Sequence, residues 1–156
     1  MKLVEALQLK ERLEDQMADT LVLISKCCKA QEGSKPPLDP DVLFQEYEAL
    51  EKELIDVTVR IQNTNNAIKF KYLNNDTAKT MTQALAELDA LKMQRLRVDY
   101  IVTHGIVEND RWSTKKIPDV SYVDVAKYYK LKQEILNQWH SLKMSIQTAN
   151  MEFDLI

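Results

Sequence analysis

Apolar residues recur every three or four positions in four stretches of this chain, the spacing that lines up side chains on one face of an α-helix. The four predicted helices cover residues 3–31, 40–65, 80–103 and 121–150. Helices of this length are each about 40 Å long, because an α-helix rises 1.5 Å per residue. Since the connections between them are short, the pattern predicts a mainly all-α fold, with four long antiparallel helices arranged as two hairpins.

The predicted helices differ in the regularity of their apolar faces. A heptad seam, typical of helices that pack side by side, runs along the second helix through Leu43, Tyr47, Leu50, Leu54, Val57, Ile61 and Thr64. The seam of the fourth helix comprises Val125, Tyr128, Lys132, Ile135, Trp139, Leu142, Ile146, Ala149 and Phe153. The first helix is less regular and predicts a broader buried face, formed by Leu3, Leu7, Leu13, Met17, Leu21, Ile24 and Cys28. Because heptad seams seldom lack a partner, the pattern predicts a coiled-coil-like homo-oligomer.

Residues suited to helix ends mark several of the predicted boundaries. Asp39 is a good N-cap, and Pro40 follows it at the first helical position. Residues 80–83 form a capping-box pattern before the third helix, and Gly105 is placed to end that helix. Residues 121–124 resemble another capping box, with aspartate in place of the usual glutamate.

Between the second and third helices, the hydrophobic period changes from that of a helix to that of a strand. Ile68, Phe70 and Tyr72 alternate with two lysines, which predicts a short strand. Part of residues 108–120 is a candidate partner for it, so a two-stranded β-ribbon would involve the segments between helices two and three and between helices three and four. Pro118 would confine that partner to an edge.

Composition narrows the class of protein without giving a function. The chain has 156 residues, which favours a single helical domain over residues 1–156. Two glycines and four prolines are too few for a β-sandwich with many turns, and leave no room for a glycine-rich phosphate loop. The net charge of −3 is mild and gives no global attraction to nucleic acid or to a membrane.

Two features favour a cytoplasmic protein without a membrane span. The first residues show no signal peptide, and the longest apolar run is far shorter than a membrane-spanning helix. The adjacent Cys27 and Cys28 fit a reducing compartment, where thiols stay free. Neighbouring helical residues point about 100° apart, so the pair is not expected to bind a metal from one face, and a buried or interface role is expected.

Catalytic motifs are weak, and neither a cofactor nor a metal is predicted. The two histidines, His104 and His140, lack ligand partners at helical spacing. Arg97 and His104 are seven residues apart and share a face of the third helix, an arrangement that resembles the helical ribonucleases called HEPN proteins. The alternative is a solvated Arg97 and a His104 that interacts with the carbonyl end of the helix.

Basic residues are concentrated in one part of the chain. Residues 92–132 contain nine Lys and Arg and five acidic residues, a charge of +4 that leaves −7 for the remainder. Trp112, Tyr122, Tyr128 and Tyr129 lie among these cations. This composition suits a surface that binds nucleic acid by stacking and phosphate contacts. The favoured alternative is that these aromatic residues pack at one end of the helical bundle while the lysines are solvated.

Arg95 falls on the core-facing seam of the third helix, beside Ala84, Leu88, Leu91, Val98 and Val102. A buried guanidinium requires a polar partner. Asn63, Asn65 and Asn150 are candidates from other helices, because amide oxygens can accept its hydrogen bonds. The sequence therefore predicts a polar cluster that fixes helix register or binds an anion.

Five stretches together resemble a known family, and the resemblance covers nearly the whole chain. The stretches are residues 30–33 (AQEG), 60–65 (RIQNTN), 85–91 (LAELDAL), 123–126 (VDVA) and 146–150 (IQTAN). They resemble the septicolysin-like family of small uncharacterised bacterial helical proteins. The resemblance implies an all-helical, oligomeric, cytosolic protein and supplies no reaction. The septicolysin label implies a pore-forming toxin, which the lack of an export signal and of a membrane-inserting segment disfavours.

These observations favour a non-enzymatic, self-associating helical protein that serves as a scaffold or binding module. The alternative is RNA binding, or a HEPN-like ribonuclease activity that uses Arg97 and His104. The toxin is a second, disfavoured alternative.

Overall fold

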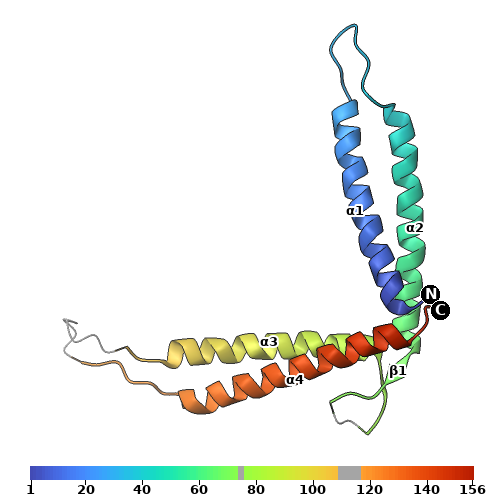
Figure 1. Ribbon diagram of the computed structural model, residues 1–156. Coiled ribbons are helices and arrows are strands. Elements are labelled where there is room, and N and C mark those ends of the chain that lie inside the picture. Colours follow the sequence, from blue (N-terminus) through green and yellow to red (C-terminus); the bar gives the residue numbers. More distant parts are fainter. Residues whose placement is uncertain (74–75, 109–116) are drawn as a thin grey trace. The chain divides into compact units, whose positions relative to one another are not determined.

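The computed structural model describes residues 1–73, 76–108 and 117–156, and is mostly helical (Figure 1). The elements follow in the order α1 (Leu3–Cys27), α2 (Pro40–Ala67), β1 (Lys69–Phe70), β2 (Lys79–Thr80), α3 (Met81–Gly105) and α4 (Val125–Glu152). The predicted class, four long helices with a short two-stranded ribbon, is confirmed. Within the described residues, no helix is both long and apolar enough to cross a membrane.

The chain divides into two compact units, which are described separately below. The first unit comprises residues 1–68 together with residues 148–156, and the second comprises residues 69–147. The helix α4 contributes residues to both. The expectation that residues 1–156 form a single helical domain stays a prediction.

The first unit is built around the antiparallel hairpin of α1 and α2, which pack closely along their lengths (Figure 1). Asp39 caps α2 as predicted, since its carboxylate accepts a hydrogen bond from the Asp41 backbone N–H at 2.9 Å. The predicted seam of α2 faces inward, with Leu43, Val57 and Ile61 buried. Burial of this apolar face is the main source of stability for such a pair of helices.

The buried face of α1 differs from the predicted one. Its buried residues are Leu3, Ala6, Leu13 and Cys27. The expectation of a broader face was wrong, because Leu7, Leu21 and Cys28 are exposed. Ala6, Lys10 and Thr20 complete a regular seam on α1. The large apolar residues of this helix do not show that seam by themselves. The helix also ends at Cys27, four residues before its predicted end.

The last residues of the chain are hydrogen-bonded into the first unit. The Leu3 backbone N–H donates to the Phe153 carbonyl at 3.0 Å, and the Leu155 N–H donates to the Met1 carbonyl at 2.9 Å. The Thr64 hydroxyl is fully buried and accepts a hydrogen bond from the Ile156 N–H at 3.0 Å. The two termini thereby satisfy backbone groups that would otherwise face the apolar interior.

The second unit begins with a short antiparallel ribbon. Lys69 pairs with Thr80, and Phe70 pairs with Lys79. The expected pairing with residues 108–120 was wrong, because the partner of β1 lies only a few residues further along the chain. A nearby partner requires closure of a shorter loop and so loses less chain entropy. Within residues 108–120, positions 109–116 lie outside the described residues.

The ends of α3 and α4 are fixed by short-range contacts. Thr80 and Gln83 form the predicted capping box, with hydrogen bonds of 3.2 Å and 2.9 Å between side chains and backbone N–H groups. For α4 the cap is Asp124, whose carboxylate accepts from the Lys127 N–H at 3.0 Å, and not the predicted Ser121. Gly105 ends α3 as expected. A Cβ atom there would lie 2.4 Å from Cγ2 of Val123, so the chain crosses too closely for any side chain.

The helices α3 and α4 run alongside each other (Figure 1), but their backbones stay farther apart than those of α1 and α2. Buried residues of the unit include Leu91 and Val98 on α3 and Ile135 and Leu142 on α4. These residues belong to the predicted seams, which therefore face inward. A Lys132–Asp99 ion pair also connects the two helices.

Candidate functional site

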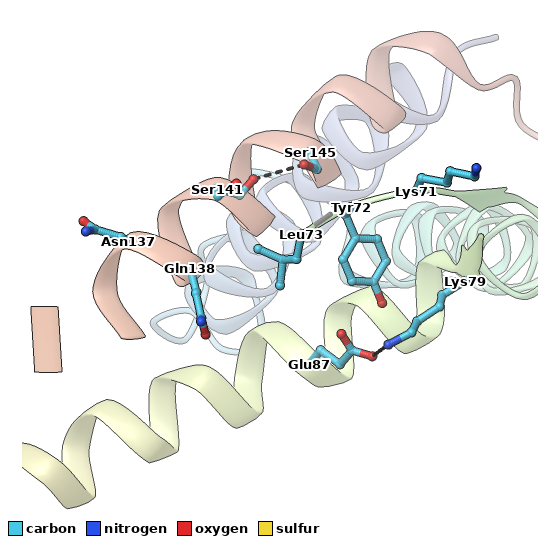
Figure 2. A pocket seen from close by; sticks show the side chains of 9 residues that line it. All are labelled: Lys71, Tyr72, Leu73, Lys79, Glu87, Asn137, Gln138, Ser141 and Ser145. Atoms are coloured by element: carbon cyan, nitrogen blue, oxygen red, sulfur yellow. Dashed lines mark hydrogen bonds and ion pairs between the residues drawn. The ribbon is translucent and has the colours of Figure 1, made fainter. Parts of the chain in front are cut away.

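An open cavity of about 870 Å³ lies in the second unit, where the ribbon segment meets α3 and α4 (Figure 2). Its lining is mostly polar and comprises Lys71, Tyr72, Leu73, Lys79, Glu87, Asn137, Gln138, Ser141 and Ser145. This volume falls within the range of typical small-molecule sites. We call it the Tyr72 cavity.

Tyr72 is the most unusual residue of this cavity. Its side chain is only 4% exposed, and its hydroxyl has no hydrogen-bond partner among the described residues. A buried hydroxyl without a partner is costly, and such groups are rare in native structures. Burial raises the pKa of this phenol to about 12, and the negative charge of the nearby Glu87 adds to the shift. The Glu87 side chain also faces the hydroxyl closely enough to raise its pKa, although the two groups do not meet the geometry of a hydrogen bond.

The charged part of the cavity is formed by β2 and α3. The Lys79 ammonium lies 2.6 Å from the Glu87 carboxylate and 5.7 Å from the centre of the Tyr72 ring. Both members of this ion pair are about one-third exposed, so solvent weakens the interaction. Figure 2 shows the Tyr72 hydroxyl directed towards this pair. The Lys79 ammonium thus neutralises the charge that the Glu87 carboxylate would otherwise present to the cavity.

The opposite wall is a polar stripe on α4. Asn137, Ser141 and Ser145 are spaced four residues apart and so share one face of the helix, with Gln138 beside them. The Ser145 hydroxyl is occupied, because it donates to the Ser141 carbonyl at 3.1 Å (Figure 2). The remaining amides and the Ser141 hydroxyl can serve a ligand as donors or acceptors.

Local sequence explains how Tyr72 reaches this position. The pairing of Phe70 with Lys79 places the ends of the two strands together, and the chain then continues through Leu73 with a positive φ of 52°. The Phe70 and Tyr72 rings lie 5.3 Å apart, which supports the buried ring from one side. Glu87 projects from α3 within two turns of its capped start at Thr80.

The polar cluster predicted around Arg95 is not formed within the described chain. Arg95 is exposed and has neither a hydrogen bond nor an ion pair among the described residues, so the expectation of a buried guanidinium was wrong. Its long side chain can carry the charge to solvent from a position beside the seam. Asn63 is exposed, Asn65 is buried and Asn150 is half-buried, and all three belong to the first unit. A role for these residues in binding stays untested.

Arg97 and His104 are both exposed on α3. The His104 Nδ1 atom lies 2.9 Å from the Tyr100 carbonyl oxygen, and the two rings stack with a centroid distance of 5.4 Å. These contacts correspond to the interaction with the carbonyl end of the helix. The nucleic-acid alternative stays a prediction, and Trp112, on which it partly depends, lies outside the described residues.

The described part of the chain has no group of side chains suited to bind a metal ion. In residues 1–73, 76–108 and 117–156, no three His, Cys, Asp or Glu side chains are grouped so that they could hold a metal ion. Cys27 is buried and Cys28 is exposed, and neither forms a disulfide.

Comparison with known proteins gives a family. A family model described as a family of unknown function (DUF6847) matches residues 10–155. The chain belongs to this family. The resemblance to septicolysin-like proteins was therefore wrong, because the family that matches almost the whole chain is DUF6847. The motifs behind that resemblance are only four to seven residues long, and three of the five lie on helices, where such short segments recur in unrelated helical proteins.

The DUF6847 chain also resembles a solved structure. A functionally unknown conserved protein from Corynebacterium diphtheriae is 26% identical to it, with a TM-score of 0.85. The match covers 100% of this chain and 99% of that protein. The comparison with curated proteins found no match.

Proposed function

We propose that this DUF6847 protein is a non-enzymatic binding module that takes up a small polar molecule in the Tyr72 cavity. The observation that carries the proposal is the buried Tyr72 hydroxyl without a partner. This hydroxyl is enclosed by its neighbours, so a ligand atom reaches it only when side chains around it move. An atom that then accepts its hydrogen bond would remove the cost of leaving this group unsatisfied.

The protonation state of Tyr72 supports binding rather than catalysis. Because its pKa is raised to about 12, the phenol keeps its proton near neutral pH and acts as a hydrogen-bond donor. A general base would need a pKa near the working pH. Among the described lining residues the one carboxylate is that of Glu87, which is engaged by Lys79.

Thermal unfolding in the presence of small polar molecules tests this proposal. A panel would contain neutral polyols, carboxylates and phosphate esters, and a ligand that binds only the folded protein raises the melting temperature with its concentration. The Tyr72→Phe variant should lose that dependence, whereas Tyr47→Phe, which changes a half-buried tyrosine outside the cavity, should keep it. Equal ligand responses in the parent and in Tyr72→Phe would contradict the proposal.

Self-association is a second candidate property, and exposed apolar residues on the α1–α2 hairpin favour it. Around the end of α1 and the start of α2, the large exposed side chains are Leu21, Val22, Leu23, Val42 and Phe44. Phe44 alone is 57% exposed. Large exposed apolar side chains gathered in one region of the surface are typical of protein interaction sites.

The distribution of charge favours a second copy of the chain as the partner that binds here, next to a groove that includes Leu23. A groove of about 470 Å³ between α1 and α2 is bordered by Asp19, Glu46 and Glu53. The start of α4 carries the exposed Lys127 and Lys130. Contact between the acidic groove of one copy and the Lys127 and Lys130 side chains of another pairs opposite charges, and a two-fold arrangement makes that contact twice.

Sedimentation velocity at tens of micromolar protein tests the second candidate. The double variant Lys127→Glu, Lys130→Glu should dissociate the oligomer, and about 0.5 M salt should weaken it by screening. Lys92→Glu, an exposed change on α3, is the matched control. A monomeric parent protein, or an oligomer that survives the charge reversal, would rule out this contact.

A further inference from the structure

We infer that the ligand of the Tyr72 cavity is a small organic anion, held through a carboxylate or phosphate group. This inference rests on the proposed binding function and adds the chemical class of the ligand. Three observations carry it: the charge of the lining, the hydrogen-bonding groups that stay free, and the volume.

The lining carries an excess of positive charge. Lys71 and Lys79 contribute two positive charges, and Glu87 contributes one negative charge. The Lys79 ammonium and the Glu87 carboxylate are 2.6 Å apart and largely compensate each other. Lys71 has no hydrogen bond or ion pair within the described part of the chain and is exposed. One uncompensated cation therefore lies at the margin of the cavity. Figure 2 shows the Lys71 side chain directed away from Tyr72 and Glu87, but because it is exposed it can turn to meet an anionic ligand.

The free groups are mainly hydrogen-bond donors. The phenol of Tyr72 keeps its proton near neutral pH, and the Lys71 ammonium can only donate. Carboxylate and phosphate oxygens accept such bonds, and bonds to a charged acceptor are the stronger kind. A cationic ligand would meet only Glu87, which is already paired with Lys79. The free hydrogen-bond donors and the excess positive charge thus both favour an anionic ligand.

The volume indicates an anion with a polar body rather than a bare inorganic ion. A cavity of about 870 Å³ has room for a hydroxylated carbon skeleton beyond the anionic group. The stripe of Asn137, Gln138 and Ser141 on α4 supplies amide and hydroxyl groups that suit hydroxyls of such a skeleton.

Three probes derived from glucose compare charged with neutral ligands: glucose 6-phosphate keeps the ring of glucose, gluconate is its open-chain carboxylate, and glucose itself is neutral. Isothermal titration calorimetry on the full chain should give dissociation constants at least about tenfold lower for one or both anions than for glucose, since a charge-assisted contact has that magnitude. Lys71→Met should remove most of this preference, and Tyr72→Phe should weaken binding of all three. Lys92→Met, an exposed lysine of α3 outside the cavity, should leave the dissociation constants within about twofold.

The outcomes distinguish this inference from the function on which it rests. If glucose binds as tightly as both anions and Tyr72→Phe weakens it, the anion inference is overturned while the binding module stands. If neither these probes nor the wider panel binds, both are overturned. An anion preference that Lys71→Met leaves unchanged would also overturn the inference, because another part of the protein would then provide the charge.

Discussion

The two helical hairpins are built from similar heptad seams but differ in how closely their helices approach. In α1–α2 the helices are close, and small residues such as Ala6, Cys27 and Thr64 are buried. In α3–α4 the helices are farther apart, and the inner positions of α4 include the half-buried Tyr128 and Trp139. Interaxial distance depends on the size of the side chains at the contact. The bulkier seam therefore explains why the wider hairpin has room for a cavity at its ribbon end.

Removal of a buried leucine from each hairpin should produce the largest effect. Leu142 is 0% exposed in α3–α4 and Leu13 is 2% exposed in α1–α2. Each change to alanine should lower the free energy of unfolding by about 2–5 kcal/mol, as measured by urea denaturation. Leu142→Ala should cost less if the wider hairpin relaxes around the lost volume.

The same titrations test whether the chain unfolds as a single domain. If it does, the protein shows one urea transition that is the same by every spectroscopic probe, and each substitution shifts that transition to a lower urea concentration. Two transitions, one shifted by Leu13→Ala and the other by Leu142→Ala, would show that the units unfold separately.

Gly105→Ala should produce the next largest effect, and only in the second unit. The new Cβ would lie 2.4 Å from Cγ2 of Val123, so the backbone must shift, at a cost of about 1–3 kcal/mol. Val123→Ala in the same chain should restore part of the loss, because it removes the atom that clashes. Gly33→Ala is a useful comparison, since a Cβ there meets nothing within 4 Å and the cost comes from its φ of +84° alone. Full stability in Gly105→Ala would contradict the close approach.

The amino-acid pattern was sufficient for the helices but not for all of their faces. The seams of α2 and α4 could be predicted because large apolar residues occupy most of their steps. The face of α1 could not, because Ala6, the half-buried Lys10 and Thr20 complete its seam without being strongly apolar. Arg95 shows the converse, since it holds a seam position by spacing and is nevertheless exposed. Position on a helix face thus predicts burial for apolar residues, but not for a long charged side chain that can reach solvent.

The candidate site was not predicted because its parts are distant in sequence. Tyr72 was assigned to a strand by alternation, and the signal of a site came only from its unpartnered hydroxyl in three dimensions. Asn137, Ser141 and Ser145 form a polar stripe next to the apolar seam of α4. Such a stripe is visible in the sequence, but solvated helix faces look the same. The β1–β2 register places Tyr72 beside Lys79, and the arrangement of α4 alongside α3 brings the stripe to the same cavity.

Tyr72→Phe should raise stability when no ligand is present, by about 1 kcal/mol at neutral pH, because it removes a buried group without a partner. The difference should grow in alkali. The pKa of Tyr72 is raised from 10.0 to about 12 on folding, so the unfolded chain loses this proton first. The parent protein therefore loses stability as the pH rises from about 10 to 12, and the phenylalanine variant is spared this loss. Urea denaturation across this range measures the difference, with Tyr47→Phe as the control; a Tyr72→Phe variant that is less stable at neutral pH would show that the hydroxyl has a protein partner.

The smallest effect expected concerns ion pairs, which differ between the hairpins in the same way as their packing. Lys132 and Asp99 join α4 to α3 and are partly buried, whereas Lys10 and Glu14 lie 3.5 Å apart within the single helix α1, and their side chains are 37% and 52% exposed. Double-mutant cycles with Lys→Met and the matching Asp→Asn or Glu→Gln changes isolate each pair. We expect a coupling energy of up to about 1 kcal/mol for Lys132–Asp99, and about 0.3 kcal/mol for Lys10–Glu14. The Lys132–Asp99 pair connects α3 and α4, whose backbones are farther apart than those of α1 and α2. We therefore expect it to stabilise the packing of these two helices where apolar contacts between them are few. Equal couplings in the two hairpins would mean that the wider spacing of α3 and α4 is maintained by their apolar side chains alone.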